Sequence, residues 1–248
     1  MDRMLYVAMT GAQQTLRTQA LISHNLANVS TVGFRKDLED FRSMPVFSTD
    51  GMPTRVYSMT ERPGIDITQA KIMTTGRDMD IAIQGEGWIA IQAPDGEEAY
   101  TRAGDLQLDV NGQLTTATGQ PVLGTAGPIA IPPAQKIDIG EDGTISIRPR
   151  GEASTEIVVV DRIRLVKPTA QNPLYKDEYG FMRTKDGAAA PPDATVKLVT
   201  GALEGSNVNP ADMLVSMIQA SRHFEMQIKM MNAGQENANS SDQLLKLE

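Results

Sequence analysis

Two helical segments lie at opposite ends of the chain, and each carries an apolar stripe with the same spacing. In the first segment the stripe recurs at steps of 4, 3, 4, 4, 3 and 4 residues: Leu5, Met9, Ala12, Leu16, Ala20, Ser23 and Ala27. In the second it recurs at steps of 4, 3, 4, 4 and 3 residues: Met213, Met217, Ala220, Phe224, Ile228 and Met231. Such steps place a stripe on one face of an α-helix. Neither helix has a helical neighbour in sequence, so the two must pack on each other or on other molecules.

Composition narrows the class of protein. The 248 residues suffice for one large domain or two modest ones. The net charge of −8 argues against nucleic acid or an anionic membrane as the main partner. Residues 1–36 carry four cationic side chains and one carboxylate, whereas residues 206–248 carry three cationic and five acidic ones, so the two ends attract weakly. The chain has no cysteine, which excludes disulfides and thiolate chemistry.

The start of the chain does not resemble a cleavable export signal. Thr10, Gln13 and Arg17 interrupt the apolar run that such a signal needs. No apolar run in the sequence is long enough to cross a bilayer. We therefore expect no membrane insertion, and we expect any export to use a route that does not read a standard signal.

The first helix is predicted to run from Arg3 to Asn28, a length of about 39 Å. Its stripe is half small residues, and its mean period is nearer to an 11-residue repeat than to a heptad, which predicts nearly straight packing. Asn28 and Gly33 both tolerate a left-handed backbone, so a chain reversal is expected between them.

The middle of the chain is predicted to be β. A polar arm runs from Asp37 to Thr75, with strand-like stretches at Thr54–Thr60 and Ile65–Ile72. A β domain follows, with strands expected at Asp80–Ile83, Trp88–Ile91, Lys136–Ile139, Thr144–Arg148, Ile157–Leu165 and Val196–Leu203. Turns are expected at Pro94–Gly96 and Asn111–Gly112, and a loop at Gly187–Asp193.

The last helix has a clear start. Asn209 is suited to the N-cap, Pro210 to the first helical position and Asp212 to the third. We expect it to continue to about Asn232 and to fray or kink near Gly234, before a final helical stretch at residues 242–247. The fold class is α+β: terminal helices form a coiled-coil-like domain, and a mainly antiparallel β domain lies between them in sequence.

Two motifs suggest a ligand but lack its context. Residues Gly85–Ala90 match G-x-G-x-x-A with Asp105 downstream, yet the run continues as a strand and supplies no helix N-terminus for a pyrophosphate, so a tight β connection is favoured. Residues 138–149 resemble a calcium loop but lack two oxygen ligands, which favours a hairpin turn at Asp142–Gly143.

Isolated titratable residues support no catalytic site either. His24 and His223 are the only histidines and lie among amide and charged residues, which favours solvated or interface roles. Asp78 and Asp80 share one strand face without a second acidic cluster. We therefore expect no catalytic residue, no cofactor and no metal ion, and a protein that is not an enzyme.

Both ends carry longer motifs that are specific. The run Ser23–Arg35 resembles the N-terminal signature of bacterial flagellar axial proteins, the rod and hook proteins, in which a helix ends in N-x-A-N-x-x-T-x-G-F-[KR]. In this chain the motif residues are Asn25, Leu26, Ala27, Asn28, Thr31, Gly33 and Phe34. Glu204–Pro210, with Asn207, Asn209 and Pro210, followed by Met217–Arg222, is similar to the C-terminal signature of that family.

The middle carries the same resemblance in the same order: Thr75–Gly76, Asp80–Ile83, Gly85–Gly87, Tyr100–Gly104 and Asn111–Leu114. One departure is Trp88-Ile89, where the family more often has two aromatic residues. The opening Met1–Ala12 and the short 37–64 segment are most similar to proximal-rod members.

The resemblance implies a structural subunit of the proximal rod of the flagellar basal body, spanning the periplasm and exported by the flagellar type III apparatus. It divides the chain into an N-terminal axial helix (1–34), an extended arm (35–75), a β domain (76–195), a return strand and linker (196–207) and a C-terminal axial helix (208–248). The two stripes would form the assembly interface with other rod proteins and with copies of the chain. In that family the terminal helices are typically disordered in the free monomer and fold on joining the rod.

Alternatives stay open. Periodicity does not separate burial within one monomer from burial between molecules. A distal-rod protein is the nearest alternative, and a secreted β-domain adaptor with a helical stalk belongs to another class.

Overall fold

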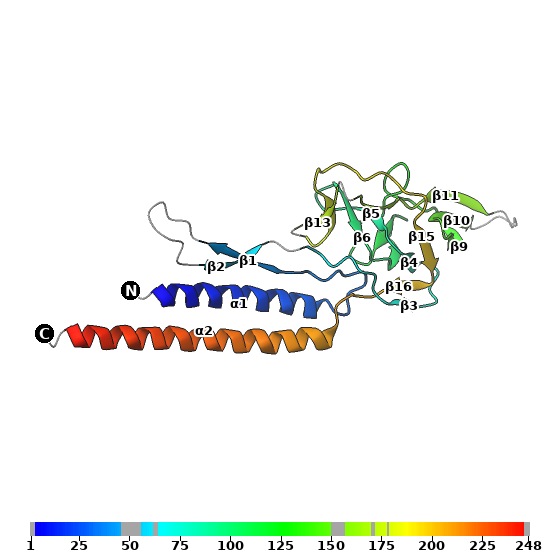
Figure 1. Ribbon diagram of the computed structural model, residues 1–248. Coiled ribbons are helices and arrows are strands. Elements are labelled where there is room, and N and C mark those ends of the chain that lie inside the picture. The colour runs from blue at the N-terminus through cyan, green and yellow to red at the C-terminus, as the bar shows by residue number, and fades with distance from the viewer. Residues whose placement is uncertain are drawn as a thin grey trace. The chain divides into compact units, whose positions relative to one another are not determined.

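The computed structural model describes residues 3–45, 56–61, 64–149, 157–169, 172–177 and 179–245. Two long helices, α1 (Arg3–Ala27) and α2 (Pro210–Leu245), precede and follow the strands in chain order (Figure 1). The chain divides into two compact units. We call residues 1–29, 36–66 and 208–248 the helical unit, and residues 30–35 and 67–207 the β unit. Among the described helices, neither has the length and apolarity needed to cross a membrane.

In the helical unit, α1 and α2 lie side by side and run antiparallel (Figure 1). The unit also holds β1 (Asp40–Pro45) and β2 (Val56–Glu61), which pair antiparallel, and β2 lies along α1. The strand predicted at Thr54–Thr60 is therefore confirmed from Val56 onward, and Thr54 lies outside the described residues.

The β unit consists of short strands: β3 (Ile72–Thr74), β4 (Ile81–Gln84), β5 (Trp88–Gln92), β6 (Glu98–Thr101), β7 (Leu106–Leu108), β8 (Leu114–Thr116), β9 (Ala134–Ile139), β10 (Thr144–Pro149), β11 (Val158–Arg162), β12 (Leu165–Val166), β13 (Leu174–Lys176), β14 (Met182–Thr184), β15 (Lys197–Thr200) and β16 (Ala202–Glu204). The largest sheet has the order β12-β5-β6-β14-β13, and a second has the order β11-β10-β9. Three further pairs are β15-β4, β16-β3 and β7-β8. All pairings of these described strands are antiparallel, which confirms an α+β chain with an antiparallel centre.

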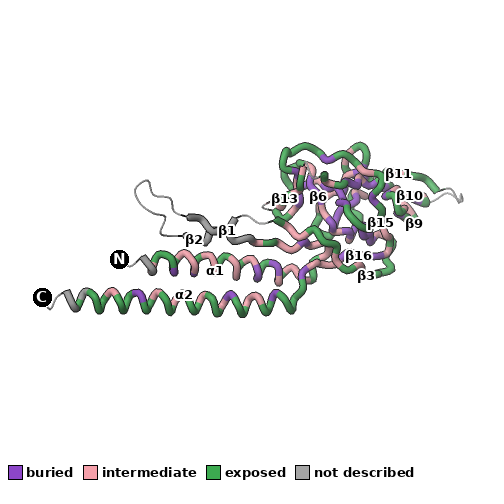
Figure 2. Tube along the Cα trace, viewed as in Figure 1, coloured by how far each residue is buried: buried purple, intermediate pink, exposed green. Residues whose placement is uncertain are grey.

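The buried segments of the β unit gather in its interior (Figure 2). They contribute to one core cluster of mostly isoleucine, leucine, valine and alanine side chains. Its fully covered members are Ile81, Ile83, Ile89, Ile91, Ala99, Leu106, Leu114, Val122 and Ile145. In β4 and β5 the alanines that alternate with these isoleucines, Ala82 and Ala90, are also fully buried. Both faces of these two strands are therefore covered, as in the interior of a layered β structure.

The turns predicted at Pro94–Gly96, Asn111–Gly112 and Asp142–Gly143 are confirmed, and Gly85–Gly87 is the expected short connection between β4 and β5. Gly187–Asp193 is a loop, as expected, apart from an isolated bridge between Pro192 and Val166.

Three strand predictions were wrong in extent. Ile65–Ile72 is not a strand: Ile65 makes one isolated bridge, and the backbone amide of Ala70 binds a carboxylate instead of a neighbouring strand. Ile157–Leu165 splits into β11 and β12, which belong to different sheets, because the amides of Ile163 and Arg164 bond to the loop carbonyls of Gly143 and Leu123.

Val196–Leu203 also splits, into β15 and β16, at Gly201. This residue has φ of 68°, and its amide donates to the carbonyl of Asp80. The two halves consequently pair with β4 and β3 in separate sheets.

The predicted end of the last helix was also wrong. α2 continues through Gly234 to Leu245 without a break. One glycine costs a helix about 1 kcal/mol relative to alanine, and residues 232–245 contain no proline and no β-branched residue to add to that cost. The hydroxyls of Ser240 and Ser241 donate to carbonyls four residues earlier, Glu236 and Asn237, and so remain compatible with the helix.

Candidate assembly site

The predicted stripe of α2 is the face that α2 turns toward α1. Met213 and Ala220 are buried, and the other members, Met217, Phe224, Ile228 and Met231, are half-buried. Within the helical unit α2 packs against α1. The two helices therefore find each other, which is one of the two outcomes that the sequence left open.

The predicted stripe of α1 lies differently. Of its members, Ala12 is buried and Leu5 is half-buried, but Met9, Leu16, Ala20 and Ala27 are exposed. The side chains that α1 does bury are Ala8, Ala12, Ile22 and Asn25. The buried face is thus rotated from the predicted one, and two large apolar side chains, Met9 and Leu16, are each 48% exposed.

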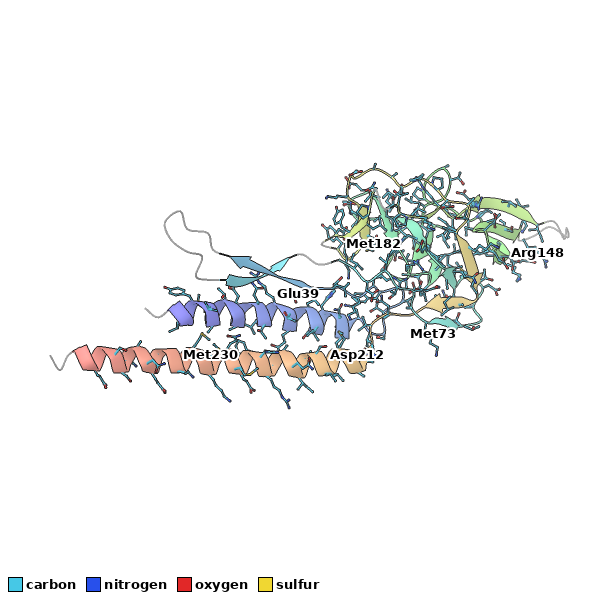
Figure 3. The ribbon with its side chains drawn as sticks, in the orientation of Figure 1. Glu39, Met73, Arg148, Met182, Asp212 and Met230 are labelled. Atoms are coloured by element: carbon cyan, nitrogen blue, oxygen red, sulfur yellow. The ribbon has the colours of Figure 1, made fainter. Side chains whose placement is uncertain are left out.

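The outer face of α2 also carries apolar side chains, which the sequence analysis missed, among exposed charged ones such as Arg222, Glu225 and Lys229. Side chains project from α2 on the side turned away from α1 (Figure 3). Exposed apolar residues on this helix are Leu214, Val215, Ile218, Met226 and Met230. These exposed apolar side chains offer surface that another chain could cover. The sequence contains these apolar residues, but they lie outside the one helical stripe from which the interface was predicted.

A groove with polar groups in its lining runs along the seam between the helices. Its volume is about 410 Å³. The groove is lined by small, amide and hydroxyl residues: Gly11, Gln14, Thr15, Thr18, Ser216, Gln219, His223 and Gln227, with Ile22 and Ala220. His223 lines the groove and is exposed. The other histidine, His24, is also exposed, and its Nδ1 lies 3.1 Å from Asp37 Oδ2.

The end of α1 is fixed by amide side chains. The fully buried Asn25 makes two hydrogen bonds with the backbone of Asp37: its Nδ2 donates to the carbonyl at 2.9 Å, and its Oδ1 accepts from the amide at 3.0 Å. Asn28 Nδ2 donates to the carbonyl of His24 at 2.9 Å. The Asn25 bonds tie the end of α1 to the segment at Asp37, and the Asn28 bond satisfies a carbonyl of the last helical turn. Of Asn28 and Gly33, only the glycine takes the left-handed backbone.

The next motif residues belong to the β unit. Gly33 has φ of 68°, and a Cβ atom there would lie 2.3 Å from the carbonyl carbon of Arg102, so the position has no room for a side chain. Its amide donates to the carbonyl of Glu204 at 2.8 Å. The ring of Phe34, a half-buried residue, lies 4.2 Å from Lys176 Nζ, a cation–π distance. Of the other motif residues, Leu26 is half-buried, and Thr31 is exposed.

The C-terminal motif also has defined partners. Asn207 donates from Nδ2 to the carbonyl of Thr68 at 3.3 Å and from its amide to the carbonyl of Phe34 at 3.3 Å. Asn209 Oδ1 accepts from the amide of Ala211 at 3.0 Å, which confirms the predicted N-cap ahead of Pro210.

A buried charged cluster links the two motifs, and the sequence analysis did not single it out. Glu204 is fully buried and accepts hydrogen bonds from Arg35 Nη2 at 2.7 Å, Arg102 Nη1 at 2.9 Å and the Ala70 amide at 2.8 Å. The guanidinium carbons of Arg35 and Arg102 lie 5.9 and 5.3 Å from the centre of the Trp88 ring. A carboxylate at the end of an otherwise apolar strand, Ala202-Leu203-Glu204, was the available signal.

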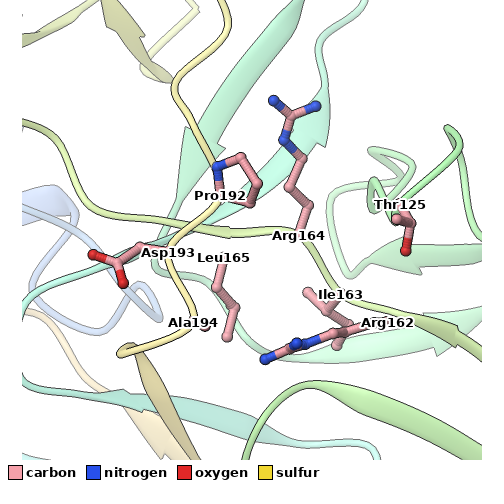
Figure 4. Close-up of a pocket in the computed structure, with 8 residues that line it drawn as sticks. All are labelled: Thr125, Arg162, Ile163, Arg164, Leu165, Pro192, Asp193 and Ala194. Carbon is pink, nitrogen blue, oxygen red and sulfur yellow. The ribbon is translucent and has the colours of Figure 1, made fainter.

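A separate pocket of about 410 Å³ lies in the β unit (Figure 4). It is lined by Thr125, Arg162, Ile163, Arg164, Leu165, Pro192, Asp193 and Ala194. Its arginines are engaged: Arg162 Nε donates to the carbonyl of Asp142, and Arg164 Nη1 lies 3.3 Å from Glu98 Oε2. Among the described residues, no group of three or more His, Asp or Glu could hold a metal ion.

Comparisons with known proteins agree with the two motifs. Residues 5–35 match the family described as flagella basal body rod protein, residues 82–147 the flagellar hook protein FlgE/F/G D1 domain, and residues 199–244 the flagellar basal body rod FlgEFG protein C-terminal family.

Relatives match over the full length. The chain is 41% identical to the flagellar basal-body rod protein FlgF of Escherichia coli (strain K12) and 40% identical to FlgF of Salmonella typhimurium, and both alignments cover 100% of each chain. It is 32% identical to the flagellar basal-body rod protein FlgG of Bacillus subtilis (strain 168), over 95% of this chain and 96% of that one.

Proposed function

This chain belongs to the family of flagellar basal-body rod proteins, as a structural subunit and not an enzyme, and we propose that it assembles into the rod through its terminal helices. The observation that carries this proposal is the apolar surface that the helix pair leaves uncovered. Met9 and Leu16 on α1 are about half exposed, and so are Leu214 and Ile218 on α2. Removing such surface from water stabilises a contact by about 25 cal/mol per Å².

We propose that the partners are copies of this chain and other rod proteins. Met-rich faces such as that of α2 suit neighbours that differ slightly, because methionine side chains adapt their shape. The position in the rod is that of the FlgF relatives rather than of the FlgG ones, since identity to FlgF reaches 41% against 32% for the FlgG of Bacillus subtilis. We place that position in the proximal rod within the periplasm, reached through the flagellar type III export apparatus.

Assembly would also complete the folding of the helices. Helix formation by isolated segments is marginal in water, and most helical stability in proteins comes from packing of an apolar face. The pair leaves much of its apolar surface uncovered, including about half of Met9 and Leu16. We therefore propose that the terminal helices gain order, and form a coiled-coil-like layer, when neighbours cover them.

The test places a charge on the exposed part of the stripe. Leu16→Asp should abolish motility and incorporation into the rod, because it would bury an unpaired carboxylate between subunits. The melting of the β unit, followed by the fluorescence of Trp88, should not change. Phe224→Asp should have the same effect on the rod, with a larger loss of helical circular dichroism, because Phe224 is half-buried in the helical unit.

The control is Gln13→Asp, which adds the same charge to an exposed polar position of α1. It should leave motility intact. If Leu16→Asp swims like the wild type, and the isolated chain is a monomer whose helices resist proteolysis, the proposed assembly is wrong, and a secreted adaptor with a helical stalk becomes the better reading.

A further inference from the structure

We propose that Glu204 is a positioning residue for rod assembly: it holds together the segment that follows α1 and the segment that precedes α2, so that both leave the β unit from one fixed point. Arg35 stands eight residues after the end of α1, and Glu204 stands six residues before the start of α2. This inference rests on the proposed function, because it concerns how the helices are presented to neighbouring subunits.

Glu204 joins four separate stretches of the β unit. Its carboxylate binds Arg35, Arg102 and the amide of Ala70, and its own carbonyl accepts the amide of Gly33. The amide of Asn207 also donates to the carbonyl of Phe34, so two backbone hydrogen bonds and the Arg35–Glu204 ion pair join the entering and leaving segments. A shift of either segment along the other would break several of these bonds together.

The hydrogen bonds within this cluster do not satisfy all of its buried charged groups, so stability alone does not account for it. Two guanidinium groups share one carboxylate, and Arg35 Nε, Arg35 Nη1 and Arg102 Nε are buried without a hydrogen-bond partner. Burial lowers the pKa of Arg102 below its ordinary value, although Glu204 opposes this effect. Buried ion pairs of this kind can often be replaced by apolar residues without loss of stability. What they provide in return is a single permitted geometry.

Trp88 and Gly33 restrict that geometry further. The Trp88 ring lies beside both guanidinium groups and offers a π surface where hydrogen-bond acceptors are lacking. Gly33 lets the entering segment approach the backbone of Arg102 so closely that no side chain fits between them. The cluster therefore fixes the segments in one register.

The main test replaces the charges but keeps the volume, with the triple variant Arg35→Met, Arg102→Met and Glu204→Leu. We expect the unfolding transition reported by Trp88 to be retained. Hydrogen exchange at the amides of Gly33 and Ala70 should accelerate, and incorporation into the rod should fall about tenfold or more. A merely structural cluster would not separate incorporation from folding in this way.

Two controls define the reference. Arg183→Met removes another arginine network of the β unit, with Asp177, Asp95 and Glu97, and should not affect incorporation. Leu114→Ala lowers the stability of the β unit without touching the cluster, and should reduce incorporation only as far as it reduces the folded fraction.

Each result decides the inference. A triple variant that folds and assembles like the wild type would overturn it. If the triple variant does not fold, Glu204→Gln is scored by the ratio of incorporation to folded fraction: a lowered ratio supports positioning, and an unchanged ratio refutes it. Leu16→Asp tells a failure of this inference from a failure of the proposed function. If Leu16→Asp abolishes incorporation but the triple variant assembles normally, only the role of Glu204 is refuted. If Leu16→Asp is also tolerated, assembly through the helices is refuted.

Discussion

The helical unit and the β unit bury different kinds of side chain. The β unit covers large residues such as Ile81, Leu106 and Leu114 completely. In the helical unit, three of the six buried apolar residues of the described part are alanines, Ala8, Ala12 and Ala220, and large residues such as Leu16 and Ile218 are about half exposed. Buried segments are sparse along α1 and α2 and dense in the β unit (Figure 2). Apolar area buried within one molecule stabilises that molecule, whereas area left exposed is available to a neighbour. The β unit is therefore stabilised within the single chain, and the uncovered apolar surface of the helical unit fits the association proposed above.

The largest effect that tests this contrast comes from matched truncations of leucine. Leu114→Ala in the β unit should cost about 2–5 kcal/mol of unfolding free energy, because it removes transfer energy and leaves a cavity. Leu16→Ala on α1 should cost the isolated chain less than about 1 kcal/mol. Denaturant titration measures both, with Trp88 fluorescence reporting the β unit and circular dichroism the helices. Similar costs at the two positions would break the comparison.

The next effect concerns the first glycine of the β unit. Gly33→Ala should lower the stability of the β unit by about 1–3 kcal/mol, because alanine is strained at positive φ and would collide with the backbone of Arg102. Gly76→Ala is the control: its φ of 73° is similar, but no atom lies within 4 Å of the added Cβ. The difference between the two melting temperatures isolates the close approach, and equal losses would show that only strain matters.

The ionisation of Tyr100 should make the stability of the β unit depend on pH in the alkaline range. The Tyr100 hydroxyl, buried, donates to Glu98 Oε1 and accepts from the amide of Ala190. Burial raises its pKa from 10.0 to about 12. The pKa of Tyr100 in the folded chain lies above its ordinary value. The stability that the protonated hydroxyl contributes to the folded chain is therefore fully present below pH 10 and is lost as pH rises through 12.

Tyr100→Phe should therefore cost about 1–3 kcal/mol at neutral pH, because the Ala190 amide loses its acceptor. The variant should also lose less stability than the wild type between pH 10 and 12. Trp88 fluorescence during alkaline titration measures this, and parallel curves for the two proteins would exclude Tyr100 as the source.

The smallest expected effect is a gain in the stability of the helical unit. Gly11→Ala on α1 should stabilise the helical unit by about 0.5–1 kcal/mol, because alanine has the higher helix propensity. The added Cβ would meet only the amide end of Gln227, which can move away. Thermal loss of helical circular dichroism is the measurement, and the β unit should melt unchanged. A lower helix transition would mean that the seam cannot admit a methyl group.

Local rules predicted the elements well where one signal dominated. The start of α2 followed from Asn209 and Pro210, and the turn at Asp142–Gly143 from its residue types, because capping and turn chemistry act within a few residues. The family motifs likewise gave the right class of protein. The end of α2 was missed, because Gly234 alone is too small a penalty to stop a helix that has no proline beyond it.

Features that depend on contacts between distant parts of the chain were not predictable from local patterns. The strand expected at Val196–Leu203 divides because its halves pair with β4 and β3, which pattern alone does not reveal. The rotation of the buried face of α1 depends on where α2 and β2 lie. The partners of Glu204 come from residues as far as 169 positions away, so the cluster existed in the sequence only as scattered charges.

The two helices differ in length, with 25 residues in α1 and 36 in α2. α2 therefore exceeds the described length of α1 by eleven residues, or about 16 Å. The last stretch of α2 is rich in asparagine, glutamine and serine, whereas methionines lie along the earlier part. A molecule placed against that tip would be selected by directional amide and hydroxyl bonds, while one placed farther along would meet a pliable surface that tolerates variety.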